Sequence, residues 1–404
     1  MGRRTRAEIA ANDYVIRTFA DPVDIDSAQW NALLDAQSSA TPFMRHEYLC
    51  ALHDSGSACP RTGWSPVFVT LEHNERIAAA CPLYAKDHSY GEYVFDWAWA
   101  DAYQRHGLHY YPKLLSAVPF TPVPGVRLLA RDAAARSALI GALQTLVGDM
   151  KLSSIHLLFA DAADQQAARE AGWMMRTTVQ FHWSNRSPEP YPDFETFLTS
   201  LQRDKRKKIQ QERRRVRDAG VTFECLEGSQ INQPDWDFFY HCYTLTYRAH
   251  RSTPYLTRAF FAQMALAMPH NWLMFNARHS GRRIATSLIA IDPTRRVAYG
   301  RYWGATEQVS CLHFEACYYQ PLEWCIKNGF ARFEGGAQGE HKMARGLLPV
   351  QTWSAHWLAH PQFASAVADF LEREGAGVAG YLDELNDRMP FKRSNAIEGT
   401  DGST

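Results

Sequence analysis

A glycine-rich segment near the carboxyl-terminal end of the chain gathers the residue types that acid–base chemistry uses. It reads FEGGAQGEHKMARGLLP over residues 333–349 and follows an expected strand at 331–335. Histidine titrates near neutral pH, a desolvated glutamate can also accept a proton, and a lysine can neutralise a developing oxyanion. The candidate catalytic residues are Glu340, His341 and Lys342, and the candidate substrate-binding residues are Gln338 and Arg345. A purely structural role for His341 stays open.

Two aromatic runs carry further candidate substrate contacts. They are FDWAWADAY at 95–103 and YGRYW at 299–303. A carboxylate among bulky rings has a raised pKa and can take a proton from an amine. Such carboxylates can equally cap a turn, and such rings are also typical of cores. The candidate substrate-binding residues in these runs are Asp96, Asp101, Tyr103, Tyr302 and Trp303.

Two loops, at 100–107 and 304–311, follow expected strands and precede expected helices. Backbone N–H groups at such a position can hold a pyrophosphate or another anion. Neither loop has the acetyltransferase pattern of Arg or Gln, two residues, Gly, one residue, then Gly or Ala. The candidate cofactor-binding residues are Gly304, Ala305, Thr306 and Gln308. No metal site is expected, because His-x-x-x-His and His-Glu-x-x-His spacings are missing.

A basic run lies at residues 203–217, with nine Lys or Arg against two acidic residues. On a helix this run is either a solvated face or a site for the phosphates of a nucleotide-linked substrate, CoA or tRNA. No aromatic residues interleave it, which disfavours recognition of single-stranded nucleic acid. Over the whole chain Lys+Arg and Asp+Glu are both 43, so the net charge does not indicate a nucleic-acid or membrane partner.

The elements that must position these residues form two similar halves. Thr41-Pro42-Phe43 recurs as Thr253-Pro254-Tyr255 about 200 residues later, and an expected hairpin at 68–84 recurs at 274–290. A third match joins WADAYQRHGLHY at 99–110 to WGATEQVSCLHF at 303–314. Three collinear matches favour duplication into paired domains rather than a solenoid.

The expected fold class is α/β (α+β), with two tandem domains that each have a mixed, mostly antiparallel sheet flanked by helices. The expected boundaries are a flexible start at 1–13, domains at 14–190 and 191–390, and a flexible tail at 391–404. The second domain begins with the basic helix. With 404 residues, 46% of them hydrophobic, the chain can bury two ordinary cores.

Local patterns predict several elements inside the first domain. Asp132 is expected to cap a helix over 133–150, the residues 93–99 are expected to form a strand, and 108–117 a helix. The first residues lack the apolar core of a signal peptide, and no run of about 18 apolar residues predicts a membrane span. A cytoplasmic location is the resulting expectation.

These features resemble the Fem-type peptidyltransferases, which are paired GNAT-like domains. The resemblance rests on Arg206-Lys207-Lys208-Ile209 before Ala219-Gly220-Val221, and on YGRYWGATEQ, a helix and GFARFEGG. PFTPVPGVRLL together with GGAQGEHKMARGLLP is more closely similar to bacterial GNAT-like N-acyltransferases described as peptidoglycan biosynthesis or recognition proteins. The resemblance covers roughly residues 40–371.

The resemblance implies direct transfer of an acyl or aminoacyl group from an activated carrier to an amine of a small molecule or peptide. Lys342 falls where Fem-type enzymes carry the lysine of a Phe-Lys motif, although its neighbour here is His341. Arg206 matches the arginine of their junction helix and is a candidate substrate-binding residue. No heptad arm interrupts the second domain, which favours acyl-CoA over aminoacyl-tRNA as donor. The alternative is a non-catalytic protein of the same scaffold that recognises a cell-wall peptide or RNA.

Overall fold

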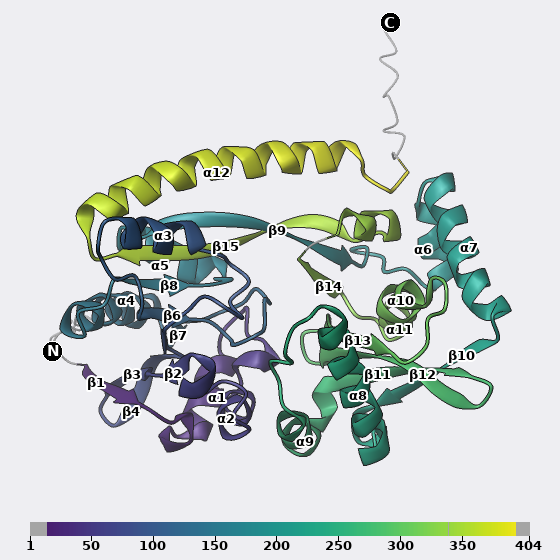
Figure 1. Ribbon diagram of the computed structural model, residues 1–404, viewed down its shortest axis with the longest axis horizontal. Helices are drawn as coiled ribbons and strands as arrows, with labels where there is room; N and C mark the ends of the chain where they lie inside the picture. Colours follow the sequence, from purple (N-terminus) through teal and green to yellow (C-terminus); the bar gives the residue numbers. More distant parts are fainter. Residues whose placement is uncertain (1–13, 338, 393–404) are drawn as a thin grey trace, which may run out of the picture. The chain divides into compact units, whose positions relative to one another are not determined.

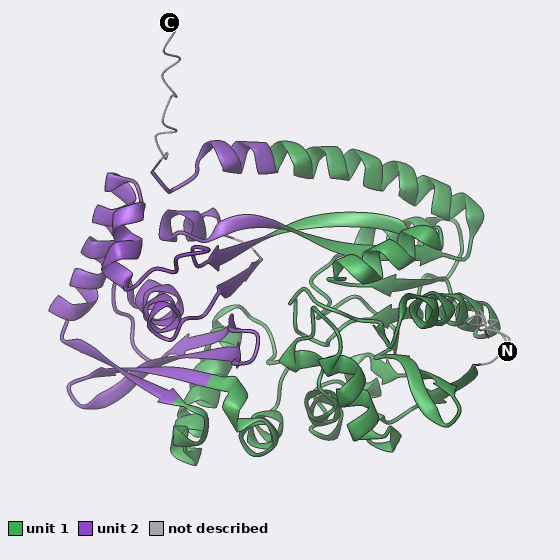
Figure 2. Ribbon diagram, turned by 180° about the vertical axis from the view of Figure 1, so that it is seen from behind, with its two compact units in different colours: residues 1–179, 227–272, 351–381 green, residues 180–226, 273–350, 382–404 purple. Residues whose placement is uncertain are grey.

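The computed structural model describes residues 14–337 and 339–392. The chain divides into two compact units, each assembled from three separate stretches (Figure 2). Unit 1 comprises residues 1–179, 227–272 and 351–381, and unit 2 comprises residues 180–226, 273–350 and 382–404. The units therefore interleave along the chain, and the expected domains at 14–190 and 191–390 stay a prediction.

Unit 1 contains most of the amino-terminal elements and two helices from the middle of the chain (Figure 1). Its strands are β1 (Val15–Phe19), β2 (Trp64–Pro66), β3 (Phe68–His73), β4 (Arg76–Cys81), β5 (Tyr84–Lys86), β6 (Lys113–Ser116), β7 (Leu129–Ala130) and β8 (Ser154–Leu157). Its helices are α1 (Ser27–Asp35), α2 (His46–Asp54), α3 (Trp97–Arg105), α4 (Ala133–Asp149), α5 (Ala162–Glu170), α8 (Gln233–Ala249) and α9 (Arg258–Ala267). Three elements are divided between the two units: β9 (Met174–Ser184), β15 (Leu348–Leu358) and α12 (Pro361–Asp387); two strands that lie mainly in unit 2, β10 (Val221–Glu227) and β11 (Trp272–His279), also place one residue each in unit 1.

The strands of unit 1 form a small sheet in the order β1-β3-β4-β7 and a second row in the order β15-β8-β6-β5-β2. Strands β6 and β8 are parallel through three residue pairs, from Leu114 opposite Ile155 to Ser116 opposite Leu157. Helix α4 packs Leu143 into the hydrophobic core of unit 1, to which strands β6 and β8 also contribute. Its start is as expected, because Asp132 accepts a hydrogen bond of 2.8 Å from the backbone N–H of Ala135.

The hairpin part of the internal repeat is confirmed. Strands β3 and β4 pair around Asn74 and Glu75, whose φ angles are 52° and 60°. The corresponding strands of unit 2, β11 (Trp272–His279) and β12 (Arg282–Asp292), are joined through Ser280 and Gly281, with φ angles of 50° and 77°. Two left-handed residues in succession are the conformation that tight two-residue hairpin turns require.

The expectations for 93–117 are wrong. Residues 93–96 contain no strand, helix α3 begins at Trp97, and the expected helix at 108–117 is instead a loop followed by β6. The match between 99–110 and 303–314 is therefore not a structural repeat, because Trp99 is helical whereas Trp303 lies in a strand. The aromatic residues favoured a strand, but Trp99 and Tyr103 lie one helical turn apart and bury one face of α3.

Unit 2 carries the glycine-rich candidate segment. Its further strands are β10 (Val221–Glu227), β13 (Val297–Ala305) and β14 (Arg332–Ala337), and the strand order is β10-β11-β12-β13-β14-β9. Its helices are α6 (Phe194–Ser200), α7 (Arg203–Asp218), α10 (Leu312–Phe314), a π-helix (Glu315–Tyr319), α11 (Gln320–Lys327) and a 3-10 helix (Glu340–Arg345). A core that includes Val216, Ile284 and Leu312 joins α7, β12 and α10.

Among the described residues, β6 pairs with β8 and β13 with β14 in parallel, whereas β1 with β3, β3 with β4, β12 with β13 and β14 with β9 are examples of antiparallel pairs. Helices accompany the sheets in both units, so the expected α/β class is confirmed. Within residues 14–337 and 339–392, none of the helices combines the length and apolar character of a membrane span.

Candidate active site

The candidate catalytic residues lie in a short helix that two glycines delimit. The 3-10 helix Glu340–Arg345 lies between Gly339, with a φ of 98°, and Gly346, with a φ of 84°. These left-handed conformations favour glycine over any residue with a Cβ. At Gly346 a Cβ would also lie 2.7 Å from Cζ of Phe197. The backbone therefore fixes where this helix begins and ends.

Lys342 points its amine into the protein rather than into solvent. The residue is 6% exposed. Its Nζ donates to the carbonyl oxygen of Gly335 at 2.6 Å and to that of Gly336 at 3.3 Å, both on β14. Burial lowers the pKa of Lys342 to about 8, because a desolvated ammonium is less stable than a hydrated one. At neutral pH this amine is still mostly protonated, and it exchanges its proton more easily than an ordinary lysine.

His341 is solvent-exposed and directly precedes Lys342 in the short helix. Its Nε2 is 3.3 Å from the hydroxyl oxygen of Tyr318, which lies in the π-helix. Partial burial and the nearby charges of Arg345 and Lys342 lower the pKa of His341. The imidazole is therefore neutral at pH 7 and can accept a proton.

A row of rings connects His341 with one of the predicted aromatic residues. The ring of His313 lies 5.7 Å from that of Tyr318 and 5.4 Å from that of Trp303. The structure thus brings Trp303 and His341 to the same region of unit 2. Tyr302 is adjacent on β13, where its hydroxyl accepts a hydrogen bond of 3.2 Å from Arg301.

Sequence reasoning missed His313 and Tyr318. The only signal was the Leu-His dipeptide of the internal repeat, which marked His313 without indicating a role. The π-helix Glu315–Tyr319, which presents Tyr318 to His341, has no counterpart in the sequence pattern. Single-turn π-helices are frequent at functional sites, so its position agrees with the site.

Arg345 fastens the segment to helix α7. The residue is 1% exposed, and its Nη2 lies 2.9 and 2.8 Å from the two carboxylate oxygens of Glu212. Its Nη1 donates to the carbonyl oxygen of His341 at 2.6 Å, and its guanidinium lies 3.6 Å from the ring centre of Phe314. Tyr319 also donates to Glu212. This geometry supports an anchoring role for Arg345, whereas its predicted contact with substrate stays a prediction.

A second proton acceptor lies on β14. Glu334 is 4% exposed and pairs in register with Tyr299 of β13 and His182 of β9. Its Oε1 lies 2.9 Å from Nε of Arg332, whereas its Oε2 is buried and lacks a hydrogen-bond partner among the described residues. Burial raises the pKa of Glu334 to about 7. Sequence reasoning placed Glu334 in the polar segment but did not identify this burial.

Two other predicted residues, Glu340 and Arg206, have less specific surroundings. Glu340 is exposed, and its Oε2 lies 3.4 Å from Nη1 of Arg388. Arg206 is half-buried in the first turn of α7. Gln338 lies outside the residues that the structure describes.

The predicted cofactor-binding residues lie at the end of β13, where this strand is paired with β12 and no longer with β14. Gly304 and Ala305 still pair with Thr286 and Ala285 of β12, and the backbone N–H of Thr306 donates to Ile284 at 2.8 Å. Gln308 is exposed in the following loop. Pairing of β13 with β14 is limited to three positions, Val297–Tyr299 against Arg332–Glu334, so the two strands part beyond them. Binding of a carrier by these four residues stays a prediction.

The substrate-binding candidates of unit 1 do not converge. Asp101 and Arg105 form an exposed ion pair on α3, with Nη2 and Oδ2 3.1 Å apart. Tyr103 is 3% exposed and packs against Phe363 at 4.0 Å between ring centres. Only Asp96 belongs to a polar cluster, in which Lys113 bonds to Asp96 and, at 2.8 Å, to Glu92.

The electrostatics of Asp96 differ from the expectation. Burial alone would raise the pKa of this carboxyl, but Lys113 and His156 hold it well below its usual range. The expected raised pKa is therefore wrong for Asp96. It is found instead at the neighbouring Glu92, where burial raises the pKa to about 7. Tyr110 also donates to Asp96 at 2.6 Å, so this carboxylate is held by several donors.

A pair of buried histidines extends the cluster. The Nδ1 atoms of His156 on β8 and His356 on β15 lie 2.8 Å apart, and Ser154 and Ser354 bond to the Nε2 atoms at 2.9 Å. Burial lowers the pKa of both rings, that of His156 to about 3, so both are neutral. Among residues 14–337 and 339–392, no three His, Cys, Asp or Glu side chains form a group that could hold a metal ion.

Comparisons with known proteins agree with this fold. Residues 22–393 match the model of the FemAB-like family, described by its role in peptidoglycan biosynthesis and recognition. The crystal structure of FemX is similar with a TM-score of 0.54 and 10% identity, over 85% of this chain and 98% of that one. L-PGS from Bacillus licheniformis is similar with a TM-score of 0.53 and 8% identity, over 87% and 97%. At these identities the likeness shows a shared fold. No curated protein sequence matches the chain.

Proposed function

Because the chain belongs to the FemAB-like family, we propose that it transfers an acyl or aminoacyl group from an activated carrier to an amine. Direct attack of the amine on the carrier's carbonyl carbon forms a tetrahedral intermediate, and loss of the carrier completes the transfer. The observation that carries the proposal is the buried amine of Lys342, held at β14 and directly preceded in the chain by His341, whose imidazole is neutral.

Lys342 is proposed to stabilise the oxyanion of the intermediate. Its pKa of about 8 leaves most of the population protonated at neutral pH, and a partly desolvated charge acts more strongly than one in water. The two carbonyl oxygens that hold Nζ fix its position before substrate arrives. Such preorganisation is what makes an oxyanion donor effective.

His341 is proposed to take the proton from the attacking amine. It is neutral, exposed to solvent and oriented by Tyr318. Glu340 is less suited, since it is ion-paired with Arg388 on the surface. Glu334 is a second candidate base, because its pKa of about 7 lets it accept a proton near neutrality.

We propose acyl-CoA as the donor and an amine of a small molecule or peptide as the acceptor. In unit 2 the longest helix wholly inside residues 180–337 and 339–350 is α7, with 16 residues, so this part of the chain has no long helical arm. The Fem-type resemblance links that arm to tRNA-borne donors. The predicted tandem GNAT-like domains at 14–190 and 191–390 belong to the same proposal.

Donor binding and turnover test the proposal separately. The melting temperature of the protein is measured with acetyl-CoA, longer acyl-CoAs and aminoacyl-tRNA over a range of concentrations, since a ligand of the folded state stabilises it by RT ln(1 + [L]/Kd). We expect a saturable rise with an acyl-CoA, followed by product formation with an amine panel detected by mass spectrometry. A rise in melting temperature with aminoacyl-tRNA alone would make aminoacyl-tRNA, and not acyl-CoA, the donor.

Two variants identify the role of the lysine. Lys342→Met should retain donor binding and lose turnover, whereas Lys327→Met, on the exposed side of α11, should retain both. Full turnover by Lys342→Met would overturn its role. No rise with any carrier would favour the non-catalytic protein that recognises a cell-wall peptide or RNA.

A further inference from the structure

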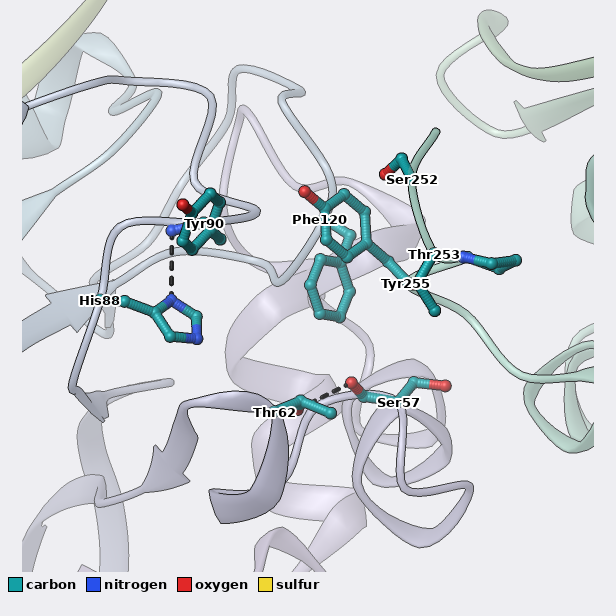
Figure 3. Close-up of a pocket in the computed structure, with 9 residues that line it drawn as sticks. Ser57, Thr62, His88, Tyr90, Phe120, Ser252, Thr253 and Tyr255 are labelled. Carbon is teal, nitrogen blue, oxygen red and sulfur yellow. Dashed lines mark hydrogen bonds between the residues drawn. The ribbon is translucent and has the colours of Figure 1, made fainter. Parts of the chain in front are cut away.

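Unit 1 contains a pocket of about 310 Å³ that the proposed transfer chemistry does not use. Figure 3 shows His88 and Tyr90 on one side, Ser57 and Thr62 below, and the segment with Ser252, Thr253 and Tyr255 opposite. This volume lies in the range of sites for small molecules. The pocket also contains the segment Thr253-Pro254-Tyr255, which the internal repeat marked without giving it a function.

The lining combines hydroxyl groups with aromatic rings, and none of the described residues that form it is Lys, Arg, Asp or Glu. The residues that line it are Ser57, Thr62, His88, Tyr90, Phe120, Ser252, Thr253, Pro254 and Tyr255. Tyr90 and Tyr255 are close enough that Tyr90 helps to raise the pKa of Tyr255, after burial. A phosphate or carboxylate would lack a cationic partner in such a lining. The pocket therefore suits an uncharged ligand that carries many hydroxyl groups.

Two positions next to the pocket walls require glycine, because a side chain there would clash with residues that line the pocket. A Cβ at Gly63, whose φ is 73°, would lie 2.2 Å from Nε2 of His88. A Cβ at Gly91, whose φ is 80°, would lie 2.7 Å from the ring of Phe120. Phe120 itself adopts a φ of 58°, which is unfavourable for an aromatic residue. Strained residues of this kind concentrate at binding sites, which supports a built pocket.

The stacked rings of the pocket exclude a flat ligand between them. Phe120 and Tyr255 are nearly parallel, with an interplanar angle of 9° and 4.7 Å between ring centres. No space remains between these two rings for a nucleobase. They form one aromatic wall, against which the C–H face of a sugar ring can pack.

Exposed aromatic residues continue from the rim of the pocket. Tyr90 is 60% exposed and Trp97 is 40% exposed, and their ring centres lie 5.0 Å apart. The ring of Trp97 stacks on that of Phe95, with 6.4 Å between ring centres. A row of exposed rings on a surface marks an interaction site. Its continuity with the pocket would allow a ligand of more than one ring.

We propose that this pocket binds an uncharged pyranose ring of a saccharide. The aromatic wall packs against the ring face, and the surrounding hydroxyl groups and His88 exchange hydrogen bonds with the sugar hydroxyls. The row from Tyr90 to Phe95 contacts a second sugar ring. This goes beyond the proposed transfer reaction, because the pocket belongs to unit 1 and needs no donor.

Calorimetric titration of the full chain with two neutral trisaccharides, one of N-acetylglucosamine and one of glucose, tests the proposal in the absence of any acyl donor. Uridine, which carries a flat aromatic base, is titrated separately as the control ligand. We expect saturable binding of at least one trisaccharide and none of uridine. No binding of either trisaccharide to the folded protein, or binding of uridine alone, would overturn the proposal.

Three variants locate the binding. Tyr90→Ala removes an exposed ring without opening the core and should weaken trisaccharide binding roughly tenfold or more. Tyr255→Phe keeps the stacked wall and removes one hydroxyl, so a smaller loss is expected. Tyr381→Ala, on α12 outside the pocket, should bind as the parent does. Unchanged binding by both pocket variants would place the saccharide elsewhere and contradict the proposal.

Discussion

Each unit holds a buried lysine beside a parallel strand pair of only three residue pairs, but the two lysines have opposite electrostatics. In unit 1, Lys113 begins β6 and bonds to the carboxylates of Glu92 and Asp96, which raise its pKa against the effect of burial. In unit 2, Lys342 donates to two backbone carbonyls at the end of β14, and burial lowers its pKa to about 8.

Under the proposed function, this difference separates a lysine with a structural role, Lys113, from one that takes part in the reaction, Lys342. Carboxylates that surround Lys113 fix its proton, so the cluster stabilises the fold of unit 1 and is unsuited to proton exchange. Carbonyl dipoles hold the amine of Lys342 in place without raising its pKa to the usual value. A group with a perturbed pKa, in the same short helix as an exposed, neutral histidine, is a candidate for acid–base chemistry.

The largest expected effect is on the stability of unit 1. Lys113→Met leaves Glu92 and Asp96 buried without their cation, which should lower the free energy of unfolding by about 3 to 5 kcal/mol. Urea unfolding followed by circular dichroism measures the change. Lys205→Met, which removes a surface ion pair with Asp204, is the control and should cost no more than about 0.5 kcal/mol. Equal losses of unfolding free energy in the two variants would contradict the structural role of Lys113.

The same substitution in unit 2 should act on rate instead. Lys342→Met should lower turnover on an identified substrate by roughly a hundredfold or more, as removal of an oxyanion donor does. It should also raise the free energy of unfolding at pH 7 by on the order of 1 to 3 kcal/mol, because the buried charge is gone.

The stability gain of Lys342→Met should depend on pH. The unfolded lysine keeps its proton up to its ordinary pKa of 10.5, whereas the folded one releases it near 8. The parent protein therefore becomes relatively more stable as pH rises from 8 to 10.5, and the advantage of the variant shrinks. Urea unfolding at pH 7 and pH 10 measures this; a gain that grew with pH would contradict the account.

The pH profile of turnover sharpens the roles of the two neighbours. Activity should rise as His341 loses its proton, below the ordinary histidine pKa of 6.5, and should fall above about pH 8 as Lys342 loses its own. Each limb should change about tenfold per pH unit. In Lys342→Arg the alkaline limb should disappear from any activity that remains, because a guanidinium stays protonated. An alkaline limb that stayed at pH 8 would assign it to another group.

The smallest effect is expected at Asp101, a predicted substrate contact. Its exposed ion pair with Arg105 lies on the surface of α3. Asp101→Asn should change both turnover and the free energy of unfolding very little, the latter by less than about 0.5 kcal/mol. A large loss of turnover would return Asp101 to the candidate site.

Sequence patterns predicted the parts of the fold that depend on local interactions. The cap at Asp132 and the two hairpins follow from neighbouring residues and were found as expected. The region 93–117 failed, because aromatic residues suit a strand or one face of a helix, and only packing of Trp99 and Tyr103 decides between them.

The candidate site was only partly predictable for the same reason. The Glu-His-Lys segment is continuous in sequence, so its residue types were visible. The hydrogen-bond partners that hold the segment, Tyr318 and Glu212, lie on other elements and meet it only in the folded chain. The burial that changes the pKa of Glu92, Glu334 and Lys342 is likewise a tertiary property.

Titration of the two lysines by NMR tests the central claim most directly. In protein labelled at the lysine side chains, with assignments from Lys113→Met and Lys342→Arg, the Nζ and Cε resonances are followed from pH 6 to 11. We predict that Lys342 titrates near pH 8 while Lys113 keeps its proton to at least pH 10.5. Titration of both lysines together above pH 10 would contradict the assignment of chemistry to unit 2.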